Sequence, residues 1–293
     1  MKTFLTALLI GAALSVSSCS SSEATETKTL RFSAIPAQDQ KDLIQQFQPV
    51  ADYLSKELGV PVEYVPAADY TASVEMFKNG QIQLAWFGGL TGVQARRAVE
   101  GARALAFGVD DPKYKSYFIA NPAAGVEPSD AFPMGLEGKS FTFGSATSTS
   151  GRLMPEHFIR KATGKSPAEF FDQENKYSGS HDKTWEMVQS GAVMAGAIDF
   201  KTYDRDLAAK KIDPEKCMVI WITPEYPDYS WNASPEVTEI LGKDGFEKLQ
   251  RALLAMKDPK LLEAINRPEG LVEAKNSDFE PLVKLAEDLG LVR

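Results

Sequence analysis

The sequence predicts an α/β protein in two lobes, and three observations support this. Strand-like and helix-like segments alternate, a pattern typical of a mostly parallel sheet covered by helices. About 270 residues follow an apparent export signal, enough for two lobes or one large α/β domain. The chain crosses to a second half at Tyr114 to Ala120 and returns at Thr223 to Trp231. Two crossings between lobes are typical of proteins that close on a ligand in a cleft.

Lobe 1 is expected to comprise residues 30–112 and 226–293. Its predicted strands are Leu30–Ile35, Val62–Val65, Ile82–Phe87 and Ala104–Val109. One helix is expected to open at Pro49 and close at Gly59, a second to be capped by Asp69, and a third to pass through Val93 and Ala98. Two leucine-rich helices, Pro235–Met256 and Phe279–Leu289, end the chain and are expected to pack on this lobe.

Lobe 2 is expected to comprise residues 113–225. It begins with the crossing strand and a loop that contains Pro and Gly. Its further predicted elements are a strand at Ser140–Phe143, a helix from near Ser150, a helix at His181–Gln189, and strands at Val193–Ile198 and Met218–Ile222.

The first 19 residues have the features of an export signal. Lys2 is followed by an apolar run, Phe4 to Leu14, that is too short to span a bilayer as a mature helix. Val16-Ser17-Ser18-Cys19 resembles the lipobox of bacterial lipoproteins, so Cys19 is the expected lipidation site and the membrane anchor. An ordinary cleavable signal and a short uncleaved anchor are the alternatives. Residues 20–29 are polar and are expected to form a flexible tether.

Composition excludes several kinds of partner and cofactor. The formal charge is −8, and removal of Lys2 with the signal makes it −9; no Lys/Arg cluster stands out, which argues against nucleic acid. Cys217 lies in an apolar run and has no partner once Cys19 is lipidated, so we expect a buried core thiol. The chain has no metal-binding motif, and no metal or cofactor is expected.

A run of small hydroxyl residues and glycine extends from Gly144 to Gly151, between a predicted strand and a predicted helix. Such a run offers free backbone N–H groups, hydroxyl donors and the positive end of a helix dipole. These features together predict a cradle for a small anion. The alternative is an ordinary Ser/Thr helix cap without a ligand.

Four short segments, in order, resemble those of the phosphonate- and phosphite-binding proteins of ABC importers. They are Ala68-Asp69-Tyr70-Thr71, Ile82-Gln83-Leu84-Ala85-Trp86-Phe87-Gly88, Ser148-Thr149-Ser150-Gly151 and Gly179-Ser180-His181-Asp182. The resemblance covers about Leu30 to Trp231. It implies a two-lobed, type II-like periplasmic solute-binding protein with its ligand in the interlobe cleft. It also implies a monomer that hands phosphite or a small phosphonate to a membrane permease, and not an enzyme.

Site residues follow from this resemblance one at a time. Tyr70, Ser148, Thr149, His181 and Asp228 match family positions, and backbone N–H groups around Ser150 and Gly151 complete the predicted donor shell. The expected ligand-binding residues are Tyr70, Trp86, Phe87, Ser148, Thr149, Ser150, His181, Asp228 and Tyr229.

Two departures from the family pattern bear on the ligand. Phe87 stands where aminoethylphosphonate-binding members have tyrosine, so one hydroxyl donor is missing. Lys201 stands where those members have an acidic residue suited to an ammonium group, with Asp199 only nearby. Both departures favour a smaller ligand such as phosphite or methylphosphonate. Asp228 is expected to accept a hydrogen bond from a P–OH group, and Phe87 or Trp86 to form an apolar wall.

Several alternatives stay open at this point. Phosphate could be the ligand, or the same pocket could serve a sensor that signals to a membrane receptor. Ser148, His181 and Asp228 are the residue types of a hydrolase triad, but no nucleophile-elbow motif accompanies them. Trp86 and Phe87 could be core residues. His157 is expected to be structural and Arg152 to have a surface or interlobe role.

Overall fold

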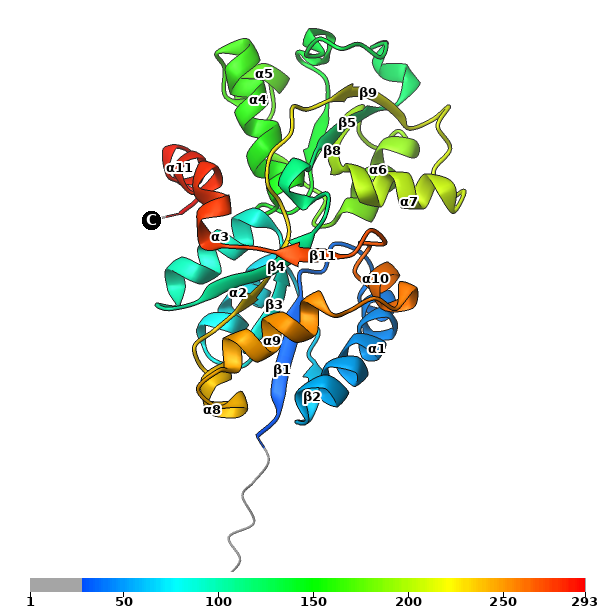
Figure 1. Ribbon diagram of the computed structural model, residues 1–293. Coiled ribbons are helices and arrows are strands. Elements are labelled where there is room, and N and C mark those ends of the chain that lie inside the picture. Colours follow the sequence, from blue (N-terminus) through cyan, green and yellow to red (C-terminus); the bar gives the residue numbers. More distant parts are fainter. Residues whose placement is uncertain (1–27, 293) are drawn as a thin grey trace, which may run out of the picture.

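A computed structural model describes residues 28–292, and it contains two β-sheets that are each covered by helices (Figure 1). We name the sheet that holds the first strand, with its helices, lobe 1, and the other sheet, with its helices, lobe 2. The predicted export signal and Cys19 lie outside the described residues.

Lobe 1 has a six-stranded sheet in the order β11-β4-β10-β3-β1-β2. The strands are β1 (Leu30–Ala34), β2 (Val62–Tyr64), β3 (Leu84–Phe87), β4 (Arg103–Gly108), β10 (Ser230–Ala233) and β11 (Leu271–Glu273). The helices are α1 (Gln40–Leu58), α2 (Tyr70–Lys78), α3 (Gly89–Ala98), α8 (Val237–Leu241), α9 (Gly245–Leu254), α10 (Pro259–Ala264) and α11 (Glu280–Asp288). Strands β1, β2 and β3 are parallel, whereas β10 runs antiparallel between β3 and β4.

Lobe 2 has a five-stranded sheet in the order β7-β6-β8-β5-β9. The strands are β5 (Ser116–Ala120), β6 (Phe141–Phe143), β7 (Lys176–Tyr177), β8 (Ala195–Asp199) and β9 (Met218–Ile222). The helices are α4 (Met154–Thr163), α5 (Pro167–Phe171), α6 (His181–Gln189) and α7 (Phe200–Ala208). Each sheet therefore has a parallel core, and in each the strand that follows a crossing, β5 or β10, runs antiparallel to that core.

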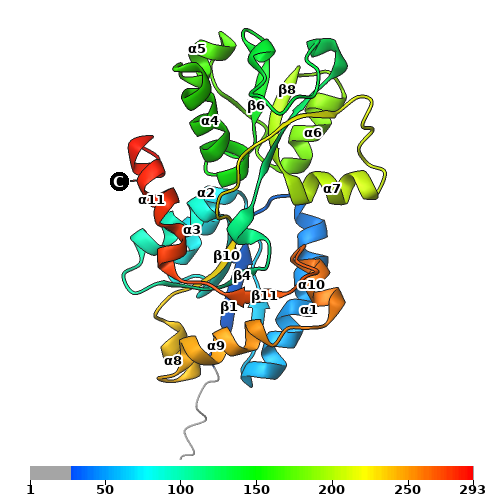
Figure 2. The ribbon, with the colours of Figure 1, turned by 45° about the horizontal axis from the view of Figure 1, so that its top comes forward.

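The two crossings between the lobes lie side by side (Figure 2). The N–H of Tyr114 donates to the carbonyl of Tyr226 at 2.8 Å, and the N–H of Tyr226 donates back at 3.0 Å. Just before this bridge, buried Asp111 pairs with buried Arg267 of lobe 1 at 2.6 Å. The Arg267 guanidinium also lies 5.5 Å from the centre of the Tyr114 ring. These contacts hold the start of the crossing segment against lobe 1.

Most predicted elements are present, and two differ from the prediction. Helix α1 begins at Gln40, capped by Asp39, and encloses Pro49 instead of opening there, because buried Leu43 and Phe47 extend its apolar face N-terminally. The helix predicted from Pro235 to Met256 is broken at Gly242, whose φ of 87° is a left-handed conformation, so it forms α8 and α9. The elements β7, β10, β11, α5, α7 and α10 were not predicted.

Core burial supports the remaining assignments. Cys217 is fully buried in lobe 2 beside Tyr203, whose hydroxyl donates to the Cys217 carbonyl at 2.6 Å, and it is free within the described chain. The predicted core thiol is confirmed. No helix among residues 28–292 is both long and apolar enough to cross a membrane.

Candidate functional site

The turn after β6 holds the residues for which the sequence predicts an anion cradle. Ser148 caps a π-helical turn, Thr149–Leu153, and its hydroxyl accepts the N–H of Gly151 at 3.0 Å. The N–H of Gly144 donates to the carbonyl of Gly151 at 2.9 Å. A Cβ at Gly151 would lie 3.1 Å from the Gly144 Cα, a crowded contact, so glycine favours this close approach of the two backbones. Ser148 is thus a helix cap, while Ser150 and Thr149 are buried beside it. Single-turn π-helices often occur at functional sites.

Helix N-termini from both lobes meet this turn. In lobe 1, the N–H of Leu90, in the first turn of α3, donates to the Thr149 hydroxyl at 2.9 Å. In lobe 2, the His181 ring at the start of α6 packs near Gly151. Helix α2 starts with Tyr70, whose hydroxyl faces the Ser148 side chain without a hydrogen bond of standard geometry. Helix N-termini carry partial positive charge, so this junction favours an anion.

Asp228 brings a carboxylate to the same junction from the returning crossing. Its Oδ1 accepts the N–H of Gly89 at 2.6 Å and the N–H of Tyr229 at 3.0 Å. Thr149 lies beside it, since both side chains come within 3.3 Å of a Cβ built at Gly88. Burial raises the pKa of Asp228 to about 7, although the hydrogen bonds from Gly89 and Thr149 oppose the shift. This carboxyl group can therefore hold a proton near neutral pH.

Direct contacts join the two lobes across the site. The N–H of His181 donates to the carbonyl of Ala37, in the loop after β1, at 3.1 Å. The bond from Leu90 to Thr149 also crosses between the lobes. Near the rim, Lys201 of α7 pairs with Asp110 at 2.8 Å and with Glu269 at 3.2 Å. The structure therefore has the lobes in contact around the predicted site.

Five buried polar atoms near this junction form no hydrogen bond of standard geometry within the described chain, although two of them, His181 Nε2 and Asp199 Oδ2, lie 3.3 Å apart. They are Tyr70 Oη, Ser150 Oγ, His181 Nε2, Asp199 Oδ2 and Asp228 Oδ2. Both carboxylates, after burial itself, raise the pKa of the Tyr70 hydroxyl, which shows that these groups lie close together. Buried polar groups are normally paired, and leaving one unpaired costs about 1–3 kcal/mol. This set of donors and acceptors suits a small oxyanion that carries a proton.

Three of the four aromatic residues predicted for the site, Trp86, Phe87 and Tyr229, have different surroundings. The Trp86 ring stacks on Tyr229 with centres 5.6 Å apart, and both side chains line a cavity. Phe87 is fully buried and packs edge-on against Phe77 at 5.6 Å. Adjacent residues of a strand point to opposite faces of the sheet. Trp86 and Tyr229 thus border open space, whereas the contacts of Phe87 are core contacts.

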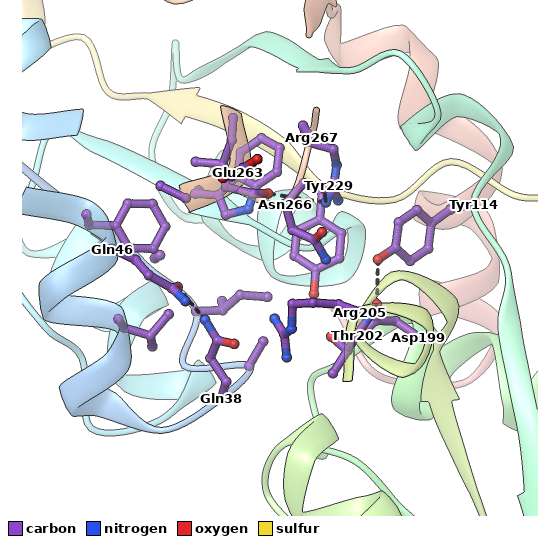
Figure 3. Close-up of a pocket in the computed structure, with 18 residues that line it drawn as sticks. Gln38, Gln46, Tyr114, Asp199, Thr202, Arg205, Tyr229, Glu263, Asn266 and Arg267 are labelled. Atoms are coloured by element: carbon purple, nitrogen blue, oxygen red, sulfur yellow. Dashed lines mark hydrogen bonds between the residues drawn. The ribbon is translucent and has the colours of Figure 1, made fainter. Parts of the chain in front are cut away.

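The cavity has a volume of about 70 Å³ and lies between the lobes (Figure 3). Lobe 1 contributes the loop after β1, helix α1 and the end of α10, while lobe 2 contributes the start of α7. The labelled polar residues that border it are Gln38, Gln46, Tyr114, Asp199, Thr202, Arg205, Tyr229, Glu263, Asn266 and Arg267. It adjoins the junction through Asp199, whose Oδ2 is 3.3 Å from His181 Nε2.

Asp199 and Arg205 were not predicted as site residues. Asp199 ends β8 and caps α7, and its Oδ1 accepts the Thr202 N–H and the Tyr114 hydroxyl, each at 2.8 Å. An Asp between a predicted strand and a helix is a signal that could have identified it. The family resemblance instead set Lys201 at the position of an acidic residue, with Asp199 only nearby. In the structure the Lys201 ammonium pairs with Asp110 and Glu269 at the rim, whereas Asp199 faces His181.

Other sequence-based expectations are settled by contacts within lobe 2. Arg152 is buried, pairs with Glu156 and lies 4.8 Å over the Phe143 ring, so it is neither on the surface nor between the lobes. His157 is half-buried in α4 and packs against Phe158, in keeping with a structural role.

The hydrolase triad does not form. The imidazole of His181 faces Asp199 and not Asp228, and its Nδ1 accepts the N–H of Asp199 at 3.4 Å. A triad base instead has a carboxylate at one ring nitrogen and the nucleophile at the other. No group of three potential metal ligands is present in the described part of the chain.

Comparisons with known proteins agree with this geometry. The family model described as "ABC transporter, phosphonate, periplasmic substrate-binding protein" matches residues 32–279. The probable ABC transporter phosphite-binding protein PhnD1 of Prochlorococcus marinus is 33% identical over 293 residues, covering 97% of this chain and 98% of that protein. The phosphate-import protein PhnD of Mycolicibacterium smegmatis is 29% identical and covers 71% of this chain and 69% of its own length.

A solved structure of the Prochlorococcus marinus protein in complex with methylphosphonate has 32% sequence identity and a TM-score of 0.85. It covers 91% of this chain and 100% of that one. The predicted two-lobed α/β binding-protein fold is thereby confirmed. The matched family consists of transport proteins and not enzymes, which also confirms that expectation. The chain belongs to the periplasmic substrate-binding proteins of phosphonate ABC transporters.

Proposed function

We propose that this protein captures phosphite or a small phosphonate such as methylphosphonate and delivers it to a membrane permease. The observation that carries the proposal is the set of five unpartnered, buried polar atoms contributed by both lobes. Tyr70, Ser150 and His181 supply donors, and Asp228 supplies an acceptor for a ligand P–OH. The relative solved with methylphosphonate supports this ligand class.

The ligand is held between the lobes, so capture favours the state in which they touch. In that state Thr149 of lobe 2 accepts from Leu90 of lobe 1, and the backbone N–H of His181 in lobe 2 donates to the Ala37 carbonyl in lobe 1. A ligand that contacts both lobes binds this closed state in preference to an open one. Binding and closure are then one process, as expected for a protein that presents loaded substrate to a permease.

Selectivity against phosphate and sulfate has two separate sources. Sulfate carries no proton near neutral pH, so its oxygens repel the Asp228 carboxylate. Phosphate keeps a proton, and its exclusion depends on an apolar surface facing the P–H or P–CH₃ corner. Trp86, stacked on Tyr229, is the candidate surface, because Phe87 packs in the core. A hydroxyl buried there without a partner costs about 1–3 kcal/mol, or roughly ten- to hundredfold in affinity.

Phosphate is the second candidate ligand, since a relative that covers much of the chain is a phosphate-import protein. Calorimetric titration of the purified protein with phosphite, methylphosphonate, phosphate and sulfate separates the candidates. We expect phosphite or methylphosphonate to bind at least tenfold more tightly than phosphate, and sulfate to bind most weakly. Phosphate binding as tightly as phosphite would contradict the apolar surface, and comparable sulfate binding would contradict the shared proton.

A further inference from the structure

Asp199 contacts both nitrogens of the His181 ring. Its backbone N–H points at Nδ1 at 3.4 Å, and its carboxylate Oδ2 lies 3.3 Å from Nε2. Both side chains are 1% exposed. A neutral imidazole has one N–H and one acceptor nitrogen, and the hydrogen bonds around it select the tautomer. The N–H donor at Nδ1 requires an acceptor nitrogen there, and the carboxylate at Nε2 requires an N–H there. Both contacts therefore favour the tautomer with the proton on Nε2.

The surroundings of the ring also disfavour a positive charge. A proton on Nδ1 would point at the Asp199 N–H, and His181 is the first residue of α6, where the helix dipole disfavours cations. Burial lowers the pKa of His181. The charge of Arg205 lowers it further, whereas the charges of Asp199 and Asp182 raise it. From lobe 1, the Ala37 carbonyl accepts a hydrogen bond from the backbone N–H of His181. Tyr70 and Asp228 face the same junction.

We propose that Asp199 is a positioning residue that holds His181 as the neutral Nε2–H tautomer, so that the oxyanion is bound without a cationic histidine. This deepens the proposed function and rests on it only for the identity of the anion. The Nε2–H, 3.3 Å from Asp199 Oδ2, is then present in both the free and the loaded protein, and the bound oxyanion shares this donor with the carboxylate. With two carboxylates at the junction and no charge on His181, the favoured ligand form is the singly charged anion that carries its own P–OH.

An isosteric substitution of Asp199 replaces the hydrogen-bond acceptor that faces Nε2 with a donor. Oδ1 of Asp199 already accepts from Tyr114 and Thr202, so in Asp199→Asn the amide oxygen takes that place. The amide nitrogen, a donor, then faces Nε2 and opposes a proton there. Asp182→Asn is the matched control, because it removes one nearby negative charge without a hydrogen bond to the ring.

Nitrogen NMR of the imidazoles tests this directly, since the chain has only two histidines and a His157→Gln variant assigns the signals. In the parent we expect His181 to show the Nε2–H tautomer, with no titration between about pH 5 and 8, where an ordinary histidine titrates. Saturating phosphite should leave this state unchanged. In Asp199→Asn, the Nδ1–H tautomer or a titrating signal should appear and phosphite affinity should fall at least tenfold, whereas Asp182→Asn should keep the parent tautomer.

A charged His181 or the Nδ1–H tautomer in the parent, free or with phosphite, would overturn the inference whether or not the Asn variant folds. An unchanged His181 spectrum in folded Asp199→Asn would show that Asp199 does not position the ring. If neither phosphite nor methylphosphonate binds the parent, the proposed function fails, but the free-protein spectrum still decides the tautomer.

Discussion

At the scale of one residue, Asp228 explains why the site should favour a ligand that carries a proton. Its carboxylate is buried, with Oδ1 held by the N–H groups of Gly89 and Tyr229 and with Oδ2 unpaired. Burial raises its pKa from 3.8 to about 7, so in the folded, ligand-free protein this carboxyl group can hold a proton at pH values where an ordinary aspartate is ionised. A ligand P–OH that donates to Oδ2 would relieve the cost of an ionised carboxylate.

The raised pKa predicts how stability depends on pH. Because the folded state holds the proton more tightly, Asp228 costs no stability below about pH 4 and an increasing amount as the pH rises to about 7. Asp228→Asn removes this cost. In the ligand-free protein, we expect it to raise the free energy of unfolding by about 2–4 kcal/mol more at pH 8 than at pH 4.

Denaturant unfolding of parent and variant at both pH values measures this difference. Asp52→Asn, at an exposed position on α1, is the control and should show no such dependence. An equal effect of Asp228→Asn at both pH values would show that Asp228 is ionised throughout.

Thr149 gives a second prediction at this scale. Its hydroxyl is buried between Leu90 and Asp228, where it can serve closure and the ligand together. Thr149→Val keeps the size and removes the hydroxyl. We expect phosphite binding to weaken by about 1.5–3 kcal/mol, the range for hydrogen bonds to charged groups.

Calorimetry at matched salt provides the measurement. Thr142→Val is the control, since the Thr142 hydroxyl donates to the Phe143 carbonyl within β6, and its affinity should match the parent. Equal affinities of Thr149→Val and the parent would show that the segment from Ser148 to Ser150 is only a helix cap.

At the scale of elements, helix starts supply most of the site. Tyr70 begins α2, Gly89 begins α3, and His181 begins α6, while Thr149 begins the π-helical turn. Each start follows a strand or a turn at the facing edges of the two sheets, so the positive ends of several helices converge there. This local positive potential would allow an acidic chain to hold the proposed anion without a net positive charge.

Helix α7 adds a contact that should depend on closure. Lys201 is 8% exposed and reaches across to Asp110 and Glu269. Lys201→Gln removes both ion pairs, which exist only when the lobes are together. We expect phosphite to dissociate about two- to tenfold faster, equivalent to about 0.4–1.4 kcal/mol, with a smaller difference at high salt.

Stopped-flow displacement measures the dissociation rate. Lys216→Gln is the control, because Lys216 pairs with Asp213 inside lobe 2 at 3.1 Å and should not respond to closure. An unchanged rate in Lys201→Gln would mean that the rim ion pairs do not contribute to the bound state.

At the scale of the whole molecule, two adjacent crossings connect the lobes and the first described residues leave lobe 1 away from the cleft (Figure 1). An anchor at Cys19, followed by the tether of residues 20–29, would leave both lobes free to close. Our proposal of a lipid anchor rests on the lipobox-like sequence.

The anchor is tested by Cys19→Ala. A diacylated N-terminal cysteine would be the main apolar attachment, so the variant should move from the membrane to the soluble fraction of cells. Fractionation followed by immunoblotting measures this, with Cys217→Ala as the control that keeps the anchor. A variant that stays as membrane-bound as the parent would exclude the lipoprotein hypothesis.

Local patterns in the sequence determined the elements and several site residues. Asp69 caps α2 and Gly59 ends α1 as predicted, because capping depends on residues within one turn. The hydroxyl run at Ser148 to Ser150 identified the cradle for the same reason: strand, turn and helix start are contiguous there. The order of family-like segments identified the two-lobed fold and the transport family.

Tertiary structure alone decided which side chains meet. Asp199 and Lys201 are two residues apart, yet one turns to His181 inside the site and the other to Asp110 at the rim. Likewise, Trp86 lines the cavity while its neighbour Phe87 packs in the core. Pairings between distant segments depend on how helices and sheets pack and on the lobes coming together. The sequence shows which residue types are available for these contacts, but the packing of the two lobes determines which residues contact one another.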